Sequence, residues 1–253
     1  MGFDKRRKFF FPRAGFVRRA AEISINLVFP PRCPICDQIV KYGKRDICEN
    51  CRPKVKYIRE PRCFKCGKQL SEEEKEYCRD CDARPHLYRQ GRALYDYSSV
   101  AGAIYRFKYK GKREYAEIFG EEIAYFLGDY IRHIQPDALI PVPMYSAKER
   151  MRGYNQAQVL AEALGKHLNI PVETDLVRRI RNTKALKALN SKERLNNLKN
   201  AFILSQNGVK LKTIIIVDDI YTTGSTIDAM SEVLLAAGVR DVYFIALAIG
   251  EGV

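Results

Sequence analysis

Two adjacent acidic residues and a turn of small hydroxylated residues are the part of this sequence best suited to chemistry. Asp218 and Asp219 follow four consecutive β-branched residues, 214–217, which suit a strand buried on both faces. A polar turn comes next, made of Thr222, Thr223, Gly224, Ser225 and Thr226. A helical pattern follows and is closed by Gly238. Because N–H groups at a helix start bind phosphate and paired carboxylates accept hydrogen bonds from a diol, the stretch predicts a site for ribose 5-phosphate.

Acidic pairs at strand ends have other uses. In many α/β proteins such a pair binds Mg²⁺ or accepts a phosphoryl group, and a buried strand without any ligand is a broader alternative still. Neither alternative explains the hydroxyl-rich turn that follows the acids. The sugar phosphate is therefore the favoured ligand.

Residues 213–226, T-I-I-I-V-D-D-I-Y-T-T-G-S-T, resemble the signature of the type I phosphoribosyltransferases, which bind 5-phosphoribosyl 1-diphosphate (PRPP) with Mg²⁺. The resemblance implies that Asp218 and Asp219 hold the ribose hydroxyls and that the turn 222–226 holds the 5-phosphate. It also implies that Arg150 and Arg152, which precede a helix start, contact pyrophosphate and join the acids as catalytic residues. A solvated basic loop is the alternative for the two arginines. The motif names no acceptor, so whether the chain is an enzyme stays open.

Eight cysteines form four C-x-x-C pairs, and each pair begins fifteen residues after the previous one. Two such pairs complete a tetrahedral Cys₄ site, so the repeat predicts two structural Zn²⁺ ions in a double zinc ribbon. Disulfides and an iron–sulfur cluster are less favoured alternatives in a reducing compartment. We expect the pairs to combine in sequence order, with cross-bracing as the alternative. The predicted ligands are Cys33, Cys36, Cys48, Cys51, Cys63, Cys66, Cys78 and Cys81.

The elements that must position these residues alternate between strand and helix patterns. Strands are expected at 92–97, 138–142, 214–217 and 242–248, and helices at 100–107, 114–131, 155–168 and 227–237. A loop is expected at 144–154, with Asn155 as the next N-cap. This order predicts an α/β protein with the parallel sheet of the type I phosphoribosyltransferase fold, preceded by a small Cys₄ double zinc ribbon module. The expected segments are 1–30, a basic tail and amphipathic helix; 31–85, the ribbons; and 86–253, the phosphoribosyltransferase-like domain.

Two further segments resemble the ComF family of bacterial competence proteins: F-P-P-R-C-P-I-C at 29–36 and P-V-P-M-Y-S-A-K-E-R-M-R-G-Y-N-Q-A at 141–157. The resemblance covers nearly the whole chain from Leu27 and implies a role in natural transformation, where members handle incoming single-stranded DNA. Residues 172–202 resemble the family's mobile hood, whose basic residues, Arg179 among them, would close on PRPP or grip a DNA backbone. The chain departs from the family at Ala185-Leu186, where members commonly have Pro-Gln.

The chain is strongly basic, with 44 lysines and arginines against 30 acidic residues among 253 and a net charge of +14. This excess of positive charge favours nucleic acid or an acidic lipid surface as a partner. The alternative is a lysine-rich surface that is merely solvated and binds no polyanion. Candidate contacts for single-stranded DNA surround the ribbons, although ribbons also serve as platforms for protein contacts. They are Lys41, Tyr42, Lys44, Arg45, Arg52, Lys54, Lys56, Tyr57, Arg59, Arg62, Phe64, Lys65 and Lys68.

No run of eighteen apolar residues is present, so no transmembrane segment is expected. The basic amino terminus lacks the apolar core of a signal peptide, which predicts a cytoplasmic location. A peripheral position at the inner membrane face is left open.

The favoured function is that of a PRPP-binding protein of natural transformation that handles incoming single-stranded DNA on the cytoplasmic side. One alternative is a phosphoribosyltransferase that acts on an unidentified small acceptor and has no DNA role. Another is a scaffold that docks a competence helicase or translocase. The histidines His86, His133 and His167 lie outside every motif, and each is expected at the surface or in the core rather than in catalysis.

Overall fold

A computed structural model describes residues 30–40, 46–71, 75–181, 201–205 and 210–250. The expected amino-terminal tail and amphipathic helix lie outside these ranges. So do most of the hood segment, including Ala185-Leu186, and three of the ribbon's basic residues with Tyr42.

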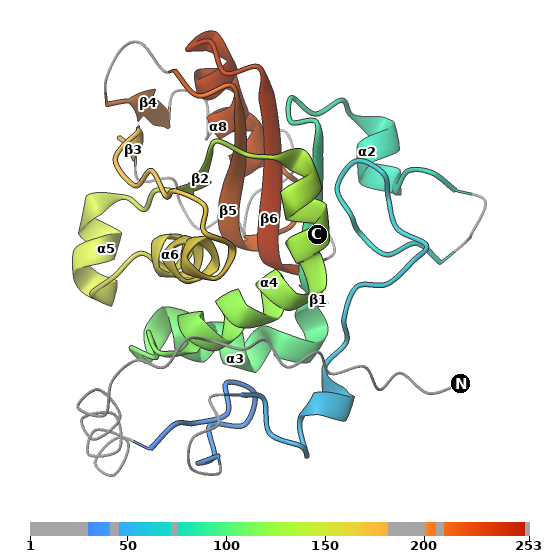
Figure 1. Ribbon diagram of the computed structural model, residues 1–253, viewed down its shortest axis with the longest axis vertical. Helices are drawn as coiled ribbons and strands as arrows, with labels where there is room; N and C mark the ends of the chain where they lie inside the picture. Colours follow the sequence, from blue (N-terminus) through green and yellow to red (C-terminus); the bar gives the residue numbers. More distant parts are fainter. Residues whose placement is uncertain (1–29, 41–45, 72–74, 182–200, 206–209, 251–253) are drawn as a thin grey trace.

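A four-stranded parallel sheet organises the chain (Figure 1). Its strands lie in the order β1 (Gln90–Asp96), β6 (Asp241–Ile249), β5 (Thr213–Tyr221) and β2 (Ala138–Pro141). β5 pairs with β6 on one side and with β2 on the other, so its run of β-branched residues is completely buried. The predicted parallel sheet is confirmed, because parallel central strands are covered on both faces and read as continuous apolar runs.

Alternate residues of β5 face two different cores. Ile215 and Val217 pack in a core with α3 (Tyr97–Tyr109), α4 (Tyr115–Ile134) and α6 (Gln156–Leu168). Ile214 and Ile216 pack in a second core with α8 (Ser225–Ala236). This alternation is the two-residue period of a strand, and it places helices on both faces of the sheet (Figure 1).

The four helices expected at 100–107, 114–131, 155–168 and 227–237 are present, with ends that differ by a few residues, but the expected loop at 144–154 is wrong. Seven of its residues form a short helix, α5 (Ser146–Arg152), which ends because Gly153 adopts a positive φ of 82°. Asn155 caps α6 as predicted, since its side chain accepts a hydrogen bond from the Ala157 N–H at 3.1 Å. A two-stranded antiparallel sheet pairs β3 (Val177–Arg179) with β4 (Phe202–Leu204).

None of the helices within the described ranges has the length and apolarity needed to cross a bilayer.

Two small ribbons pack against the two cores. The first ribbon, residues 31–55 with the short 3₁₀ helix η1 (Arg52–Lys54), shares a core with α3 and α4. The second ribbon, residues 61–83 with α2 (Arg79–Ala83), shares the core of α8. The linker between them pairs with the edge of β1, where the Ile58 N–H donates to the Leu94 carbonyl at 3.0 Å. Figure 1 shows the first ribbon below α3 and the second beside β1.

Glu122 of α4 attaches the first ribbon and its linker to the domain. Its Oε1 accepts hydrogen bonds from both terminal nitrogens of Arg52, each at 3.1 Å. Its Oε2 accepts from the hydroxyls of Tyr57 at 2.6 Å and Tyr95 at 3.2 Å. Because Glu122 is 9% exposed, this carboxylate is a buried acceptor with four donors.

We expect Glu122→Ala to destabilise the protein by about 3 kcal/mol, because a guanidinium and two hydroxyls lose their buried partner. For a chain of this size that loss lowers the melting temperature by roughly 6 to 12 °C. Thermal unfolding followed by circular dichroism measures it. The neighbouring Glu121 is exposed on the same helix, so Glu121→Ala is the matched control. Equal shifts in the two variants would contradict the assignment.

Candidate functional site

The acidic pair lies near the carboxyl end of β5. The strand continues past both acids to Tyr221, because Ile220 and Tyr221 still pair with β6. Asp219 is buried, Asp218 is half-buried, and the Asp219 N–H donates to Asp218 Oδ1 at 2.8 Å. Burial, together with repulsion from Asp219, raises the pKa of Asp218 to about 7. At neutral pH the Asp218 carboxyl therefore exchanges between its neutral and its charged form.

Lys108 in the last turn of α3 binds the second acid. Its Nζ lies 2.8 Å from Asp219 Oδ1, and less than a fifth of either side chain is exposed. Lys108 directly follows the helix expected at 100–107, and no motif of the sequence assigned it a role. No local pattern could have assigned this contact, because the two residues come from distant parts of the chain.

The polar turn forms the start of α8, as predicted, and is called the phosphate loop (residues 222–226) below. Gly224 is the N-cap of α8, with φ of 76°, and the hydroxyls of Thr223 and Ser225 lie 3.0 Å apart. A Cβ at Gly224 would lie 2.7 Å from the Tyr221 hydroxyl, so only glycine fits. Unpaired N–H groups and small hydroxyls at the start of a twelve-residue helix suit a phosphate group.

The charges of Lys108 and of Arg179 in β3 favour the ionised form of Asp218. Burial and the neighbouring charges of Arg179 and Arg152 lower the pKa of Lys148. Burial lowers the pKa of Arg179, and Asp218 opposes that shift. The charges of Arg179 and Arg152 therefore act on Lys148, and the charge of Asp218 acts on Arg179.

Of the two arginines predicted to contact pyrophosphate, Arg150 is exposed on α5. Arg152 is half-buried, donates to Gln156 Oε1 at 3.0 Å and lies 4.7 Å from the ring centre of Tyr109. Lys148 and Arg152 are four residues apart, so recognising the segment as a helix would have placed both side chains on the same helical face.

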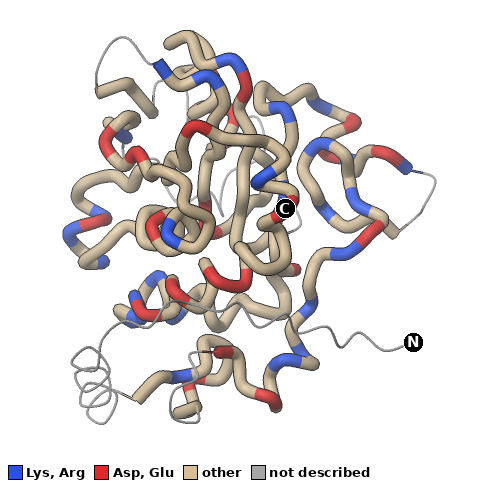
Figure 2. The backbone as a smooth tube through the Cα atoms, viewed as in Figure 1, with Lys and Arg blue, Asp and Glu red and all other residues tan. Residues whose placement is uncertain are grey.

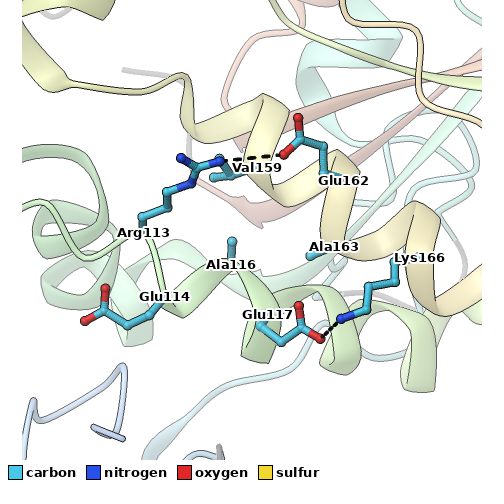
Figure 3. A pocket seen from close by; sticks show the side chains of 8 residues that line it. All are labelled: Arg113, Glu114, Ala116, Glu117, Val159, Glu162, Ala163 and Lys166. Atoms are coloured by element: carbon cyan, nitrogen blue, oxygen red, sulfur yellow. Dashed lines mark hydrogen bonds and ion pairs between the residues drawn. The ribbon is translucent and has the colours of Figure 1, made fainter. Parts of the chain in front are cut away.

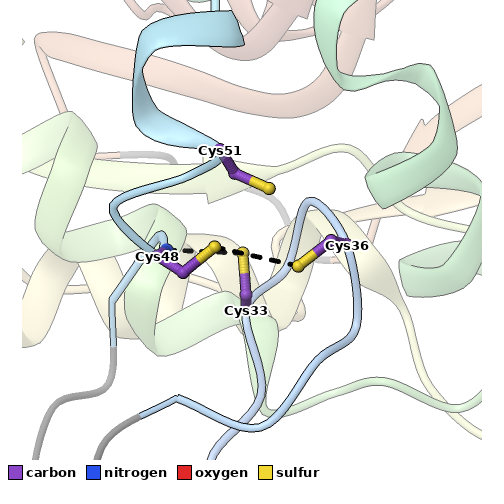
Figure 4. A group of neighbouring side chains, drawn as sticks. All are labelled: Cys33, Cys36, Cys48 and Cys51. Atoms are coloured by element: carbon purple, nitrogen blue, oxygen red, sulfur yellow. Dashed lines mark hydrogen bonds between the residues drawn. The ribbon is translucent and has the colours of Figure 1, made fainter.

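The eight cysteines form two groups of four, Cys33 with Cys36, Cys48 and Cys51, and Cys63 with Cys66, Cys78 and Cys81. Within each group all four sulfurs lie within 4.8 Å of one another, which confirms the pairing in sequence order. The sulfurs of Cys36 and Cys48 are 3.8 Å apart, and those of Cys66 and Cys78 are 3.6 Å apart. Tetrahedral zinc with bonds of about 2.3 Å separates its sulfurs by roughly 3.8 Å, so both groups fit structural zinc, and Figure 4 shows the first of them.

A groove of about 420 Å³ lies between α4 and α6 (Figure 3). It shares no residue with the acidic pair, the phosphate loop or the cysteines. Its charges neutralise one another, since Lys166 lies 3.0 Å from Glu117 and Arg113 lies 3.9 Å from Glu162. The groove is therefore a charged seam between two helices, and the candidate chemistry lies at the carboxyl edge of the sheet.

Two family models match the chain. Residues 24–82 match the double zinc ribbon domain, and residues 116–250 match the phosphoribosyl transferase domain. The second match covers more than half of the chain and includes the acidic pair, the phosphate loop and the basic side chains of α5 and β3.

Curated relatives match different shares of the chain. Competence protein ComFC of Bacillus subtilis is 30% identical over 202 residues, 76% of this chain and 79% of its own. Competence protein F of Haemophilus influenzae is 41% identical over 115 residues, and the match spans 45% of this chain and 50% of the relative. DNA utilization protein YhgH of Escherichia coli K12 is 36% identical over 103 residues, 41% of this chain and 45% of its own. With its paired Cys₄ groups and its parallel-sheet domain, the chain belongs to the ComF family of competence proteins, which join a double zinc ribbon to a phosphoribosyltransferase domain.

Proposed function

We propose that this protein binds PRPP, or a related ribose phosphate, at the carboxyl end of β5 and handles incoming single-stranded DNA in natural transformation. The observation that carries the first half is the arrangement of the site. An acidic pair lies just before a helix start with small hydroxylated residues, and the basic side chains of Lys108 and Arg179 interact with the acids. These are the three kinds of group that a ribose diol, a 5-phosphate and a pyrophosphate require.

In this proposal each group has one role. Asp218 and Asp219 accept hydrogen bonds from the ribose hydroxyls, and Lys108 holds the Asp219 carboxylate in place. The phosphate loop binds the 5-phosphate. Arg152, Lys148 and Arg179 bind pyrophosphate, with Arg150 at the exposed edge. Carboxylate and phosphate oxygens are the ligands that Mg²⁺ prefers, so the site fits an Mg²⁺ ion that enters with PRPP and neutralises pyrophosphate charge.

The proposed role in handling DNA rests on the relatives of this chain and on its net charge. The names of its relatives associate them with competence and with DNA utilization. The net charge of +14 favours a polyanion, and Figure 2 shows basic residues along the chain that connects the two ribbons. Of the basic candidates there, Lys54, Lys56 and Arg59 are exposed. We propose a cytoplasmic location, where incoming single strands and PRPP would both be available.

Replacing Lys54, Lys56 and Arg59 together by glutamine is expected to weaken binding of single-stranded DNA by roughly 100-fold at 0.1 M salt. Three phosphate contacts are lost, so the slope of log K against log salt becomes shallower by about 2. Fluorescence anisotropy over a salt series measures both quantities. The control triple, Arg132→Gln, Lys166→Gln and Arg240→Gln, removes the same charge from exposed side chains that have acidic partners. An unchanged slope in the first triple would show that DNA binds elsewhere.

Binding of ribose 5-phosphate with Mg²⁺ is expected to strengthen about tenfold between pH 6 and pH 8. The pKa of Asp218 is raised to about 7, so its carboxyl group is mostly neutral below that value and is a weaker acceptor for a ribose hydroxyl and a poorer partner for Mg²⁺. Calorimetric titration at several pH values measures the change. In Asp218→Asn only the smaller contribution of the ligand's own phosphate ionisation, near pH 6, is expected to remain. An equally steep profile in that variant would exclude Asp218 as the titrating group.

A second candidate, phosphoribosyl transfer to a small acceptor, is favoured by the same pKa. A carboxylate that titrates near neutral pH suits a general base. An acceptor nitrogen or oxygen would attack C1 of the ribose, pyrophosphate would leave with the bonding electrons, and Asp218 would take the acceptor's proton. Release of pyrophosphate from PRPP and Mg²⁺, measured with bases, nucleosides and DNA as acceptors, separates turnover from binding alone.

A further inference from the structure

The segment that joins the second ribbon to β1, residues 84–88, contacts the phosphate loop directly and is called the connecting segment. Arg84 Nη2 donates to the Thr223 carbonyl at 2.6 Å, and the same nitrogen lies 3.3 Å from Asp228 Oδ2. Arg84 comes three residues after the last zinc ligand, Cys81. One side chain therefore bridges the end of the second ribbon and the backbone of the phosphate loop.

Asp228 in the first turn of α8 collects two more contacts from the connecting segment. The Leu87 N–H donates to its Oδ1 at 3.0 Å, and its Oδ2 lies 2.8 Å from His86 Nδ1. The side chain of His86 is 1% exposed, as expected for a histidine of the core. Together with Arg84 these contacts fix the position of the helix start whose N–H groups form the phosphate loop.

The connecting segment also packs closely against the loop. The hydroxyls of Tyr88 and Tyr221 lie 2.7 Å apart, and His86 stacks on Tyr88 with ring centres 4.9 Å apart. A Cβ at Gly224 would lie 3.0 Å from the His86 ring. A shift of the connecting segment would therefore move the backbone that is to bind phosphate.

The opposite side of the connecting segment rests on the second zinc group. Lys65 lies between the zinc ligands Cys63 and Cys66; its carbonyl accepts from the Gly91 N–H at 2.9 Å, and its Nζ lies 5.3 Å from the ring centre of Tyr88. Both cysteines are completely buried and belong to the same core as Tyr88. Zinc in this group thus holds one side of the segment whose other side holds the phosphate loop.

We propose that zinc in the second ribbon and ribose phosphate at the phosphate loop each strengthen the binding of the other, with Arg84, His86 and Asp228 as the positioning residues. This inference rests on the proposed binding of ribose phosphate at residues 222–226. Coupling between two sites is reciprocal, so the factor by which zinc improves ligand affinity equals the factor by which ligand improves zinc retention. The zinc group is then part of the ligand site as well as a structural module.

The first ribbon provides an internal comparison, because it packs against other elements. Arg106 of α3 donates to the carbonyls of Pro34 at 3.0 Å and Ile35 at 2.5 Å. The Tyr115 hydroxyl donates to Asp37 Oδ1 at 2.6 Å. These contacts attach the first zinc group to α3 and α4, so ribose phosphate should leave its zinc retention unchanged.

The test measures zinc retention separately in each ribbon of the full chain. Zinc-loaded protein is treated with a chelator and N-ethylmaleimide, and mass spectrometry of peptides reports the alkylation rate of each cysteine. Ribose 5-phosphate is the ligand, and its binding to the same sample is measured by calorimetry without Mg²⁺. We expect saturating ribose 5-phosphate to slow alkylation of Cys63, Cys66, Cys78 and Cys81 by at least about fivefold and to leave the first ribbon unaffected.

Two variants assign the effect. Arg84→Met removes a partly exposed side chain. In this variant the factor by which ribose 5-phosphate slows alkylation of the second ribbon should fall towards one, and ribose 5-phosphate should bind more weakly by a similar factor. Arg106→Met removes the equivalent guanidinium contacts of the first ribbon and should leave the coupling intact. Wild-type protein that binds ribose 5-phosphate with no protection of the second ribbon would overturn this inference and leave the proposed function standing. Wild-type protein that binds no ribose 5-phosphate would overturn the proposed function and this inference with it.

Discussion

Replacing Asp218 and Asp219 together by asparagine should abolish binding of PRPP with Mg²⁺. Micromolar binding corresponds to about 8 kcal/mol, and an amide offers one uncharged acceptor oxygen where a carboxylate offers two and a negative charge that favours a divalent ion. The expected loss is at least about 100-fold, which calorimetry reports as the disappearance of heat. Asp137 supplies the matched control at the opposite end of β5, where its Oδ2 accepts from the N–H groups of Lys212 and Thr213. Asp137→Asn should leave PRPP binding unchanged.

Asp218→Asn alone should separate ligand binding from stability. The pKa of Asp218 is raised from 3.8 to about 7, so the folded state resists its ionisation and loses stability as the pH rises through that interval. The loss is at most about 4 kcal/mol and is complete above pH 7. Asp218→Asn should therefore melt at a higher temperature than the wild type at pH 8, with little difference at pH 4, while its affinity for PRPP falls. A variant that binds PRPP as the wild type does would remove Asp218 from the site.

The sequence was most informative where a single element carries its own pattern. The run 214–217 predicted a central strand buried on both faces, because such a strand has paired strands at both edges and packed helices on both faces, and this position excludes polar residues. The polar turn predicted a helix start because a glycine and small hydroxylated residues are the residues that the first turn of such a helix requires locally, and Gly224 is the N-cap of α8. The cysteine spacing predicted both zinc groups because two closely spaced thiolates are the local unit of a ribbon.

Contacts between distant segments could not be predicted from such patterns. Lys108 binds Asp219, and Arg84 binds the Thr223 carbonyl, only after the sheet has brought their segments together. The helix α5 was missed for a different reason. Its seven residues contain too few apolar side chains to show a helical period, so Lys148 and Arg152 were treated as loop residues.

Charge counting around the ribbons overestimated the residues available to a nucleic acid. Arg52 binds Glu122, Lys68 lies 2.7 Å from Asp80, and Lys65 lies over the ring of Tyr88. Tyr57, a candidate for stacking on bases, uses its hydroxyl to bind Glu122. A basic residue in a small domain can be a structural partner instead of a free surface charge, and only burial and partners distinguish the two.

Cys66→Ser is expected to cost most of the stability of the second ribbon and to destabilise the core that the ribbon shares with α8. The Cys66 side chain is completely buried, and serine cannot replace a thiolate ligand, so the group loses its metal. Structural zinc contributes about 10 to 16 kcal/mol to the folding of zinc-finger peptides near neutral pH. We therefore expect the variant to hold one zinc ion per chain, against two in the wild type, and to be poorly soluble.

Native mass spectrometry counts the ions, and thermal unfolding measures the loss of stability. Phe64→Ser is the matched control, because Phe64 lies between the same two ligands but is 54% exposed. It should keep two ions and melt close to the wild type. Since Tyr88 and Tyr221 share the core of Cys66, loss of this zinc should also loosen the phosphate loop. Substitution of Cys36, which is partly buried and packs against the other core, should affect mainly the first ribbon. A Cys66→Ser variant that keeps two ions and an unchanged melting temperature would refute the zinc assignment of the second group.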